Sequence, residues 1–415
     1  MAETPAAIST PSVDFDQIRK DFPVLSEQVR DKPLVYLDNG ASSQMPAVVA
    51  DRLDHYHRHE HANVHRGIHH LSQKATDAFE ETRKKVQQFI NAEHLHEVVY
   101  TTGTTDSINL VAHSFGQQFI SEGDEIVVSE IEHHANIVPW QIVAQQNGAK
   151  VRVIPVNDDG DLIWEEYTAL LNENTAIVAV GHVSNSLGTV NPAQEIIKEA
   201  HRHDIPVLLD GAQAAPHQAV DVQKLDADFY TFSAHKMCGP TGFGILYGKE
   251  KYLNAMPPYR TGGEMIDKVA FEETTYNELP HKFEAGTPPI AAGIGLATAI
   301  DYLNDIGMNN IASREHHLLE YATDKLLTIE GLRIIGTADQ KASVVSFVID
   351  GIHATDIGTI LDQQGIAVRT GHHCAQPTMR RFNIPATARA TISFYNNKDD
   401  IDRLAEGIRE AKEFF

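Results

Sequence analysis

The chain has 415 residues, of which 42% are hydrophobic and 22% charged, as is ordinary for a soluble globular protein with room for two domains. Its formal net charge of −23 argues against a nucleic-acid binder or a membrane-surface protein, because both rely on basic patches. No apolar run approaches the roughly 20 residues that span a bilayer, and the polar segment 1–11 lacks the features of a signal peptide. Two cysteines, Cys238 and Cys374, cannot form a disulfide framework, so a cytoplasmic location is predicted.

The first part of the chain alternates short β-branched runs with helical patterns, which predicts a mainly parallel sheet flanked by helices. Helices are predicted over 105–120, 138–146 and 193–203. The stretch 256–280 has no clear periodicity and is predicted to be a long functional loop. The predicted strands are 98–101, 125–129, 150–155, 176–181, 206–210, 229–233 and 244–247.

From about Pro289 the pattern changes, and longer helices surround fewer strands. Helices are predicted over 289–306, 311–328, 353–364 and 399–415, with a strand at 344–349. This pattern predicts a second, smaller α+β domain. We therefore expect a large α/β domain at 30–295 and a small domain formed by 1–29 together with 296–415.

Two polar residues follow predicted strands at positions where chemistry is common. Asp210 ends the apolar strand 206–210, where open α/β sheets bind their ligands, although an aspartate can also cap the following turn. Such a carboxylate can pair with a pyridine nitrogen and make the ring an electron sink. Lys236 lies in the polar turn that follows strand 229–233, and burial there would lower its pKa and suit it to covalent carbonyl chemistry.

Two further segments link a predicted strand to a helix. The run 101–105, Thr-Thr-Gly-Thr-Thr, offers hydroxyls and backbone N–H groups that either cap the helix or cradle a phosphate. With Asp210 and Lys236 in the same sheet, we favour the phosphate. His133 follows strand 125–129, and its imidazole could stack on a planar ring, shuttle protons or be structural.

The C-terminal part holds an arginine and a cysteine in unusual settings. Arg389 lies in an apolar strand, so it either forms a buried ion pair or binds a substrate carboxylate. Cys374 follows Gly371-His372-His373 with Arg369 close by, and cationic neighbours favour a nucleophilic thiolate. Cys238, beside Lys236, is interpreted as a small packing residue.

Histidines alternate between residues 55 and 61, which raises the question of a metal site. His55 and His59 lie on a different helix face from His57 and His61, and no cysteine or carboxylate completes a familiar zinc set. The pattern predicts a solvated helix and no metal site.

Together these segments resemble the cysteine desulfurases, in the class V aminotransferase branch of the fold-type I enzymes that use pyridoxal 5′-phosphate. The match looks closest to the SufS-type, or group II, desulfurases, and it covers nearly the whole chain after about Phe15. The run Arg-Thr-Gly-His-His-Cys at 369–374 is the most specific part. Other matching motifs are 37–39, 63–67, 104–109, 129–136 and 183–185.

The resemblance implies a role for each matching position. Lys236 would hold the cofactor covalently and later move the substrate Cα proton, while Asp210 would pair with the pyridine nitrogen. Gln213 would contact the ring oxygen, and His133 would stack on the ring. The implied phosphate ligands are Thr104, Thr105, Ser233, His235 and, from the partner subunit of a homodimer, Thr287.

The resemblance also implies the substrate and the reaction. Arg389 and Asn185 would hold the carboxylate of L-cysteine, with Arg369 and Arg66 as further substrate-binding residues. Cys374 would take the sulfur as a persulfide and release L-alanine. An acceptor protein of SufE or SufU type would then receive the sulfur for iron–sulfur cluster assembly.

Other functions stay open from the sequence. A selenocysteine lyase or a cysteine-sulfinate desulfinase would use the same cofactor and largely the same residues. An ordinary aminotransferase or epimerase would make Cys374 incidental. A sulfur-transfer scaffold without catalysis is disfavoured by the presence of Asp210, Lys236 and Arg389.

Overall fold

The computed structural model describes residues 13–415, so the expectation for segment 1–11 lies outside the described residues. A large sheet of seven strands has the order β4-β10-β9-β8-β7-β5-β6. Its neighbours pair in parallel except for β10, which is antiparallel to both β4 and β9. The strands are β4 (Val98–Thr101), β5 (Glu125–Ser129), β6 (Lys150–Ile154), β7 (Thr175–Gly181), β8 (Val207–Asp210), β9 (Phe229–Ser233) and β10 (Gly244–Gly248).

Helices cover both faces of this sheet, and the α/β fold predicted from the sequence is confirmed. Leu208 and Leu209 are adjacent in β8, yet they belong to two different apolar clusters, one on each face. Burial on both faces explains why these strands are apolar almost throughout. The helices are α2 (Ala47–His59), α3 (His70–Phe89), α4 (Thr104–Phe119), α5 (Val138–Asn147), α6 (Trp164–Leu170), α7 (Ala193–His201), α8 (Val222–Leu225), α9 (Glu250–Ala255) and α10 (Ile290–Ile306).

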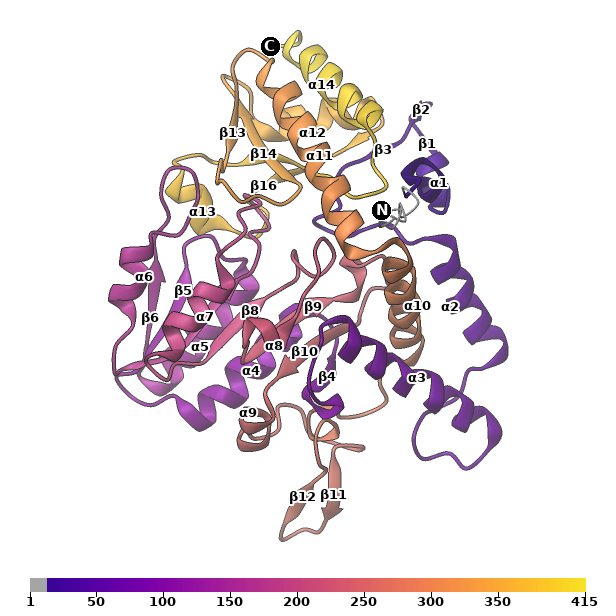
Figure 1. The fold of residues 1–415 in the computed structure, drawn as a ribbon, viewed down its shortest axis with the longest axis vertical. Coiled ribbons are helices and arrows are strands. Elements are labelled where there is room, and N and C mark those ends of the chain that lie inside the picture. The colour runs from indigo at the N-terminus through magenta and orange to yellow at the C-terminus, as the bar shows by residue number, and fades with distance from the viewer. Residues whose placement is uncertain (1–12) are drawn as a thin grey trace, which may run out of the picture.

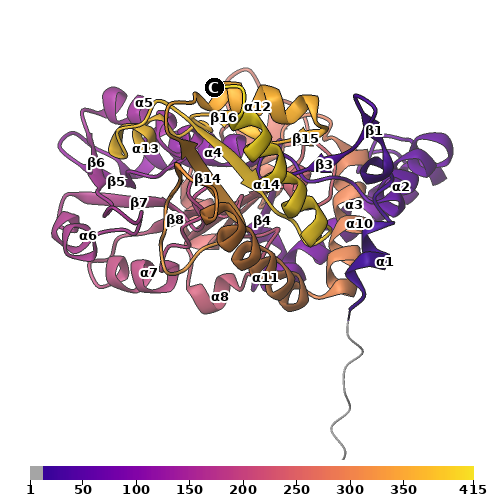
Figure 2. The same cartoon turned by 90° about the horizontal axis from the view of Figure 1, so that it is seen from above.

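A second sheet of four antiparallel strands has the order β13-β14-β17-β16. It packs with three helices around its own apolar core, and Figures 1 and 2 show this unit covering one end of the large sheet. Its elements are β13 (Leu332–Ile335), β14 (Val344–Ile349), β16 (Arg369–Gly371), β17 (Thr387–Thr391), α11 (Met308–Leu327), α12 (Ala354–Gln363) and α14 (Lys398–Lys412). The short α13 (Gln376–Arg381) connects β16 to β17.

The N-terminal elements reach both apolar cores. Phe22 packs in a core of the large sheet, whereas Val35 packs in the core of the small sheet. These elements are α1 (Phe15–Arg19), β1 (Gln28–Val29), β2 (Lys32–Pro33) and β3 (Val35–Tyr36), which pairs in parallel with β15 (Ile366–Ala367). Buried side chains of α10 belong to a large-sheet core as far as Ile306. The boundary between the two domains at residue 295 stays a prediction.

The stretch 256–280, predicted as an aperiodic loop, contains a hairpin of β11 (Ile266–Val269) and β12 (Thr274–Tyr276). The prediction failed because both strands are largely exposed, and an alternating pattern arises only where one face is buried. Figure 1 shows this hairpin projecting away from the rest of the chain.

Across residues 13–415, none of the helices combines the length and the apolar character that a membrane crossing demands.

Candidate active site

A cavity lies at the edge where the parallel strands of the large sheet end. Asp210 ends β8, Ser233 ends β9, and Lys236 closes the 3₁₀ turn Ala234–Lys236 that follows. Because β4, β5, β7, β8 and β9 run in the same direction, the residues after them converge at this edge. Of the predicted site residues, those lining the cavity are Thr104, Thr105, His133, Asn185, Asp210, Gln213, Ser233, His235, Lys236, Arg369, Cys374 and Arg389.

Two predicted site residues lie elsewhere. Thr287 is exposed on the segment before α10, and it lines a different hollow of the surface. Arg66 is exposed in the loop before α3, where its Nε lies 2.9 Å from Glu264 Oε1. A single chain therefore does not bring these two side chains to its own cavity.

The electrostatic environment of Lys236 suits a reactive amine. Burial lowers the pKa of Lys236 to about 8, and the positive charges of Arg389 and Arg369 act in the same direction. The carboxylate of Asp210 partly opposes this shift. A substantial fraction of the amine is thus neutral slightly above neutral pH, as nucleophilic chemistry requires.

Asp210 and Gln213 lie on the loop beside this lysine. Burial raises the pKa of Asp210, whose Oδ1 accepts a hydrogen bond from Ala212 N at 2.9 Å. Gln213 Nε2 donates to Gly40 O at 2.7 Å, and its Oε1 is buried without a partner. That oxygen can accept a hydrogen bond from a hydroxyl on a bound ring.

His133 and Glu132 lie on the loop after β5. Burial lowers the pKa of His133 to about 4, with Lys236 adding to the effect, so the imidazole is neutral and able to stack on a ring. Glu132, which sequence reasoning missed, lines the cavity and accepts hydrogen bonds from Asn136 Nδ2 at 2.7 Å and Gly181 N at 2.8 Å. Its bonds tie the ends of β5 and β7 together next to His133.

The first turn of α4 lies beside the cavity, where Thr104 and Thr105 line it. The helix starts after Gly103, whose φ of 148° favours glycine, and no side chain caps it. Thr104 N donates to Ser233 Oγ at 2.8 Å, which joins the ends of β4 and β9. Free N–H groups at a helix N-terminus attract anions, so this turn fits a phosphate.

The segment carrying Cys374 is tied to both sheets. His373 and Cys374 have φ of 51° and 56°, a left-handed conformation that is uncommon outside glycine. Asn185 Nδ2 donates to His373 O at 2.7 Å, and His134 N donates to Cys374 O at 2.7 Å. The amide donor of Asn185 is thus bound to this loop, which leaves its buried Oδ1 without a partner.

Arg389 forms a buried ion pair, which is one of the two alternatives that its sequence suggested. It is 2% exposed, its Nη2 donates to Asp38 Oδ1 at 3.2 Å, and its Nη1 donates to Asn185 O at 2.8 Å. It also lines the cavity, and its Nε is buried without a partner. Buried polar atoms rarely go unpaired, so the unpaired atoms of Gln213, Asn185 and Arg389 are available to hydrogen-bond a polar ligand or water in the cavity. The residues present therefore fit pyridoxal phosphate with an amino acid.

The histidine-rich segment forms no metal cluster. His55, His57 and His59 lie exposed on α2, and His61 follows its end. Within the described part of the chain, no group of three or more histidine, cysteine or acidic side chains is arranged to hold a metal ion.

Comparisons with known proteins define the class to which this cavity belongs. Residues 35–404 match the aminotransferase class-V family, so the chain belongs to this family. A cysteine desulfurase of Synechococcus elongatus is 51% identical over 405 residues, which cover 97% of this chain and 65% of that protein. A probable cysteine desulfurase of Halalkalibacterium halodurans is 51% identical over 399 residues, covering 96% of this chain and 98% of that protein.

Two solved structures share the fold over nearly their whole length. The cysteine desulfurase CsdA of Escherichia coli, in an S-sulfonic acid form, has a TM-score of 0.90 at 39% identity and covers 97% of this chain. The match spans 99% of that chain. The apo cysteine desulfurase of Thermococcus onnurineus has a TM-score of 0.92 at 38% identity, covering 99% of this chain and 100% of that chain.

Proposed function

We propose that this protein is a pyridoxal-phosphate-dependent cysteine desulfurase of the SufS type. It converts L-cysteine to L-alanine, leaves the sulfur on Cys374 as a persulfide, and passes it to an acceptor protein of SufE or SufU type for iron–sulfur cluster assembly. The observation that carries the proposal is one cavity lined by Lys236 and Asp210 from the large sheet and by Cys374 and Arg389 beside the small sheet. The cysteine desulfurases similar to this chain support the choice of substrate.

The cavity residues hold the cofactor from several sides. Lys236 would hold pyridoxal phosphate covalently, Asp210 would pair with the pyridine nitrogen, and Gln213 would accept a hydrogen bond from the ring hydroxyl. The neutral imidazole of His133 would stack on the ring. Thr104, Thr105, Ser233 and His235 would hold the phosphate at the first turn of α4. When bound, pyridoxal phosphate supplies an electron sink for negative charge at the substrate Cα.

The remaining steps use groups of this chain. Arg389 and Arg369 bind the substrate carboxylate, for which the planar guanidinium is well suited. Lys236 Nζ takes the proton from the substrate Cα, a role favoured by a pKa of about 8. The Cys374 thiolate attacks the substrate sulfur, so an S–S bond forms as the Cβ–S bond breaks. The electron pair of that bond stays with the carbon skeleton, which is protonated at Cβ, regains a proton at Cα and leaves as alanine.

We further propose that the active form is a homodimer in which Thr287 and Arg66 serve the cavity of a second copy. Both side chains are exposed and lie outside the cavity of their own chain. Two large apolar side chains lie in solvent: Ile68, two residues after Arg66, is 105% exposed, and Phe271, in the turn of the β11–β12 hairpin, is 109% exposed. Packing against a second copy would remove the apolar surface of these side chains from water.

The direct test is to incubate the holoenzyme with L-cysteine, assay alanine, and determine the mass of the peptide that contains Cys374. We expect alanine together with one added sulfur atom on that peptide. In a Cys374→Ser variant, alanine formation from L-cysteine should fall to background while the absorbance of the bound cofactor is unchanged.

Two outcomes would change the conclusion. Alanine without sulfur on Cys374 would contradict the persulfide step, and pyruvate or inverted amino acid in its place would indicate an aminotransferase or an epimerase. If the Cys374→Ser variant still acts on L-selenocysteine, the persulfide step is specific to L-cysteine.

A further inference from the structure

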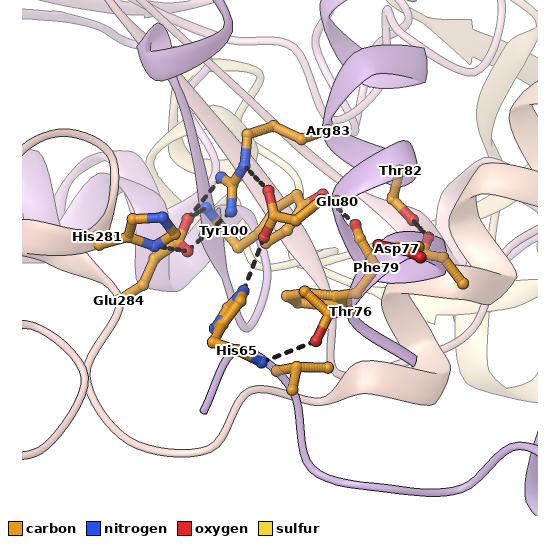
Figure 3. A network of polar contacts seen from close by, with 12 residues as sticks. His65, Thr76, Asp77, Phe79, Glu80, Thr82, Arg83, Tyr100, His281 and Glu284 are labelled. Carbon is orange, nitrogen blue, oxygen red and sulfur yellow. Dashed lines mark hydrogen bonds and ion pairs between the residues drawn. The ribbon is translucent and has the colours of Figure 1, made fainter. Parts of the chain in front are cut away.

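A cluster of charged and histidine side chains surrounds the buried Arg83 outside the cavity, and Figure 3 shows it from close by. We call it the Arg83 cluster; its members are His65, Glu80, Arg83, His281 and Glu284. Arg83, on α3, is 1% exposed, and its Nη1 and Nη2 donate to the two carboxylate oxygens of Glu284 at 2.7 and 2.9 Å. Its Nε donates to Glu80 Oε2 at 3.1 Å.

A buried ion pair of this kind is weak evidence for a stabilising role, because desolvation of the charges offsets most of their attraction. What the pair does supply is one defined geometry. Arg83 Nη1 also donates to Val98 O at 2.7 Å, and Glu284 Oε1 accepts from Tyr100 N at 2.8 Å. Glu284 is thus fixed to α3 and to β4 at once, only three residues before Thr287.

The same cluster also holds the segment that contains Arg66. His65 Nε2 lies 2.9 Å from Glu80 Oε1, and the rings of His65 and His281 contact each other with centroids 5.4 Å apart. A second link joins the two segments through residues 263–264, because Arg66 pairs with Glu264 while Gly286 N donates to Gly263 O at 2.9 Å. His65, Glu264 and Thr287 line a single hollow of the surface.

We infer that the Arg83 cluster is a positioning device that fixes the segments of Thr287 and Arg66 as one unit for the cofactor site of a second copy of this chain. The inference rests on the proposed function, since it takes from it the cofactor and the homodimer. The cluster residues touch neither cofactor nor substrate. They act through Thr287, which would meet the cofactor phosphate, and through Arg66.

The test uses dimers assembled from two differently tagged chains and purified through both tags. Lys236→Ala removes the covalent attachment of the cofactor from one site, so the visible band of the lysine-linked cofactor reports only on the other site. In the first arm Glu284→Gln and Lys236→Ala are on the same chain, paired with an unchanged chain. In the second arm they are on opposite chains.

The two arms give opposite expectations. In the first arm the surviving site receives Thr287 from the altered chain, and its dissociation constant for pyridoxal phosphate should rise by about tenfold or more, as expected for a lost hydrogen bond to a charged group. In the second arm the surviving site receives an unaltered segment and should bind normally. Equal effects in both arms, or a defect only in the second, would overturn the inference.

Pyridoxal, which lacks the phosphate, is a second probe. It distinguishes loss of the phosphate contact from a general structural defect of the site. Titration with pyridoxal should give equal affinities in both arms, because the contact in question is to the phosphate. If Glu284→Gln also weakens pyridoxal binding by the same factor in the first arm, the cluster does not act through Thr287, and the inference is wrong.

Matched variants on α3 cover the case in which Glu284→Gln fails to fold. Glu80→Gln leaves the Arg83–Glu284 pair in place but removes the charge that holds His65, so a smaller loss in the first arm is expected. Glu81→Gln is the control, because Glu81 forms an exposed pair with Lys84 on the same helix. A loss with Glu81→Gln equal to that with Glu80→Gln would contradict the inference.

The unchanged homodimer, assayed in parallel with L-cysteine, separates the inference from the proposed function. A holoenzyme that binds pyridoxal phosphate and shows the difference between the arms, yet forms no alanine, would refute the proposed activity alone. Normal alanine formation with no difference between the arms would refute the positioning role alone.

Discussion

At the scale of single residues, the site depends on the amine of Lys236, which is buried where its charged form is destabilised. Burial lowers the pKa of Lys236 from 10.5 to about 8, and Arg389 and Arg369 add to the effect, while Asp210 counteracts part of it. The charged form of the amine is therefore destabilised in the folded protein. Covalent attachment of a cofactor consumes this amine, which relieves the cost.

The lysine should leave a signature in the stability of the cofactor-free protein. Because its folded pKa is depressed, the unfolded chain binds more protons between pH 8 and pH 10.5, so this group makes the free energy of unfolding rise with pH there. We expect Lys236→Met to be more stable than the parent below pH 8, by at most roughly 3 kcal/mol. The difference should vanish above pH 10.5.

Urea denaturation of both proteins across this pH range measures the difference directly. Using the difference between the two proteins removes the contribution of other titrating groups. A gap between parent and variant that stays constant with pH would show that Lys236 does not titrate at a lowered pKa.

Site residues that directly follow a strand could be predicted from the sequence. Residues whose role depends on a contact far away in the chain could not. Asp210 and Lys236 were found because the carboxyl ends of parallel strands share one edge, whatever the strand order. Asp38 and Glu132 were missed because nothing near them in the chain indicates their contacts, Arg389 for one and Gly181 for the other. Asn185 was assigned to the substrate, although its amide donor is bound to the Cys374 segment.

At the scale of elements, strands buried on both faces were the most predictable. Strands of the large sheet were predicted closely because both faces are buried and their residues are apolar almost throughout. The hairpin β11–β12 and the short β16 have no fully buried residue, so hydrophobic periodicity could not find them. The antiparallel direction of β10 depends on its two neighbours and carries no local signal.

The cap of α14 is an element whose contribution can be measured alone. Asn397 accepts a hydrogen bond from Asp400 N at 2.9 Å, and the buried side chains of this helix belong to the core of the small sheet. Asn397→Ala should lower the free energy of unfolding by about 1 kcal/mol, as expected for a lost N-cap. Urea denaturation checks the value, and Asn397→Asp, which keeps an acceptor, should lie close to the parent. Equal losses in the two variants would rule out the capping contribution.

At the scale of the whole molecule, the dominant property is charge. A net charge of −23 keeps copies of the chain apart near neutral pH, so any association must occur through a locally apolar or charge-matched surface. The isoelectric point is about 5.4, so mild acidification brings the net charge of the protein to zero.

Mild acidification should therefore make the protein molecules associate at a pH where the chain is still folded. We expect light scattering of the protein to peak close to pH 5.4, where repulsion between molecules disappears, and to fall again on either side. Circular dichroism recorded on the same samples separates association from unfolding. Scattering that increases only where the helical signal is lost would contradict this expectation.

The register of the small sheet has a consequence of its own. Arg369 in β16 lies directly opposite Arg389 in β17, and both side chains line the cavity. Like charges in facing positions repel each other across a strand pair. The two facing arginines therefore make this part of the cavity favourable for an anion. Asp38 pairs with Arg389 alone, so we expect a carboxylate between the two guanidinium groups to reduce the repulsion that remains. Under the proposed function, we expect this register to favour substrates that carry a carboxylate over simple amines.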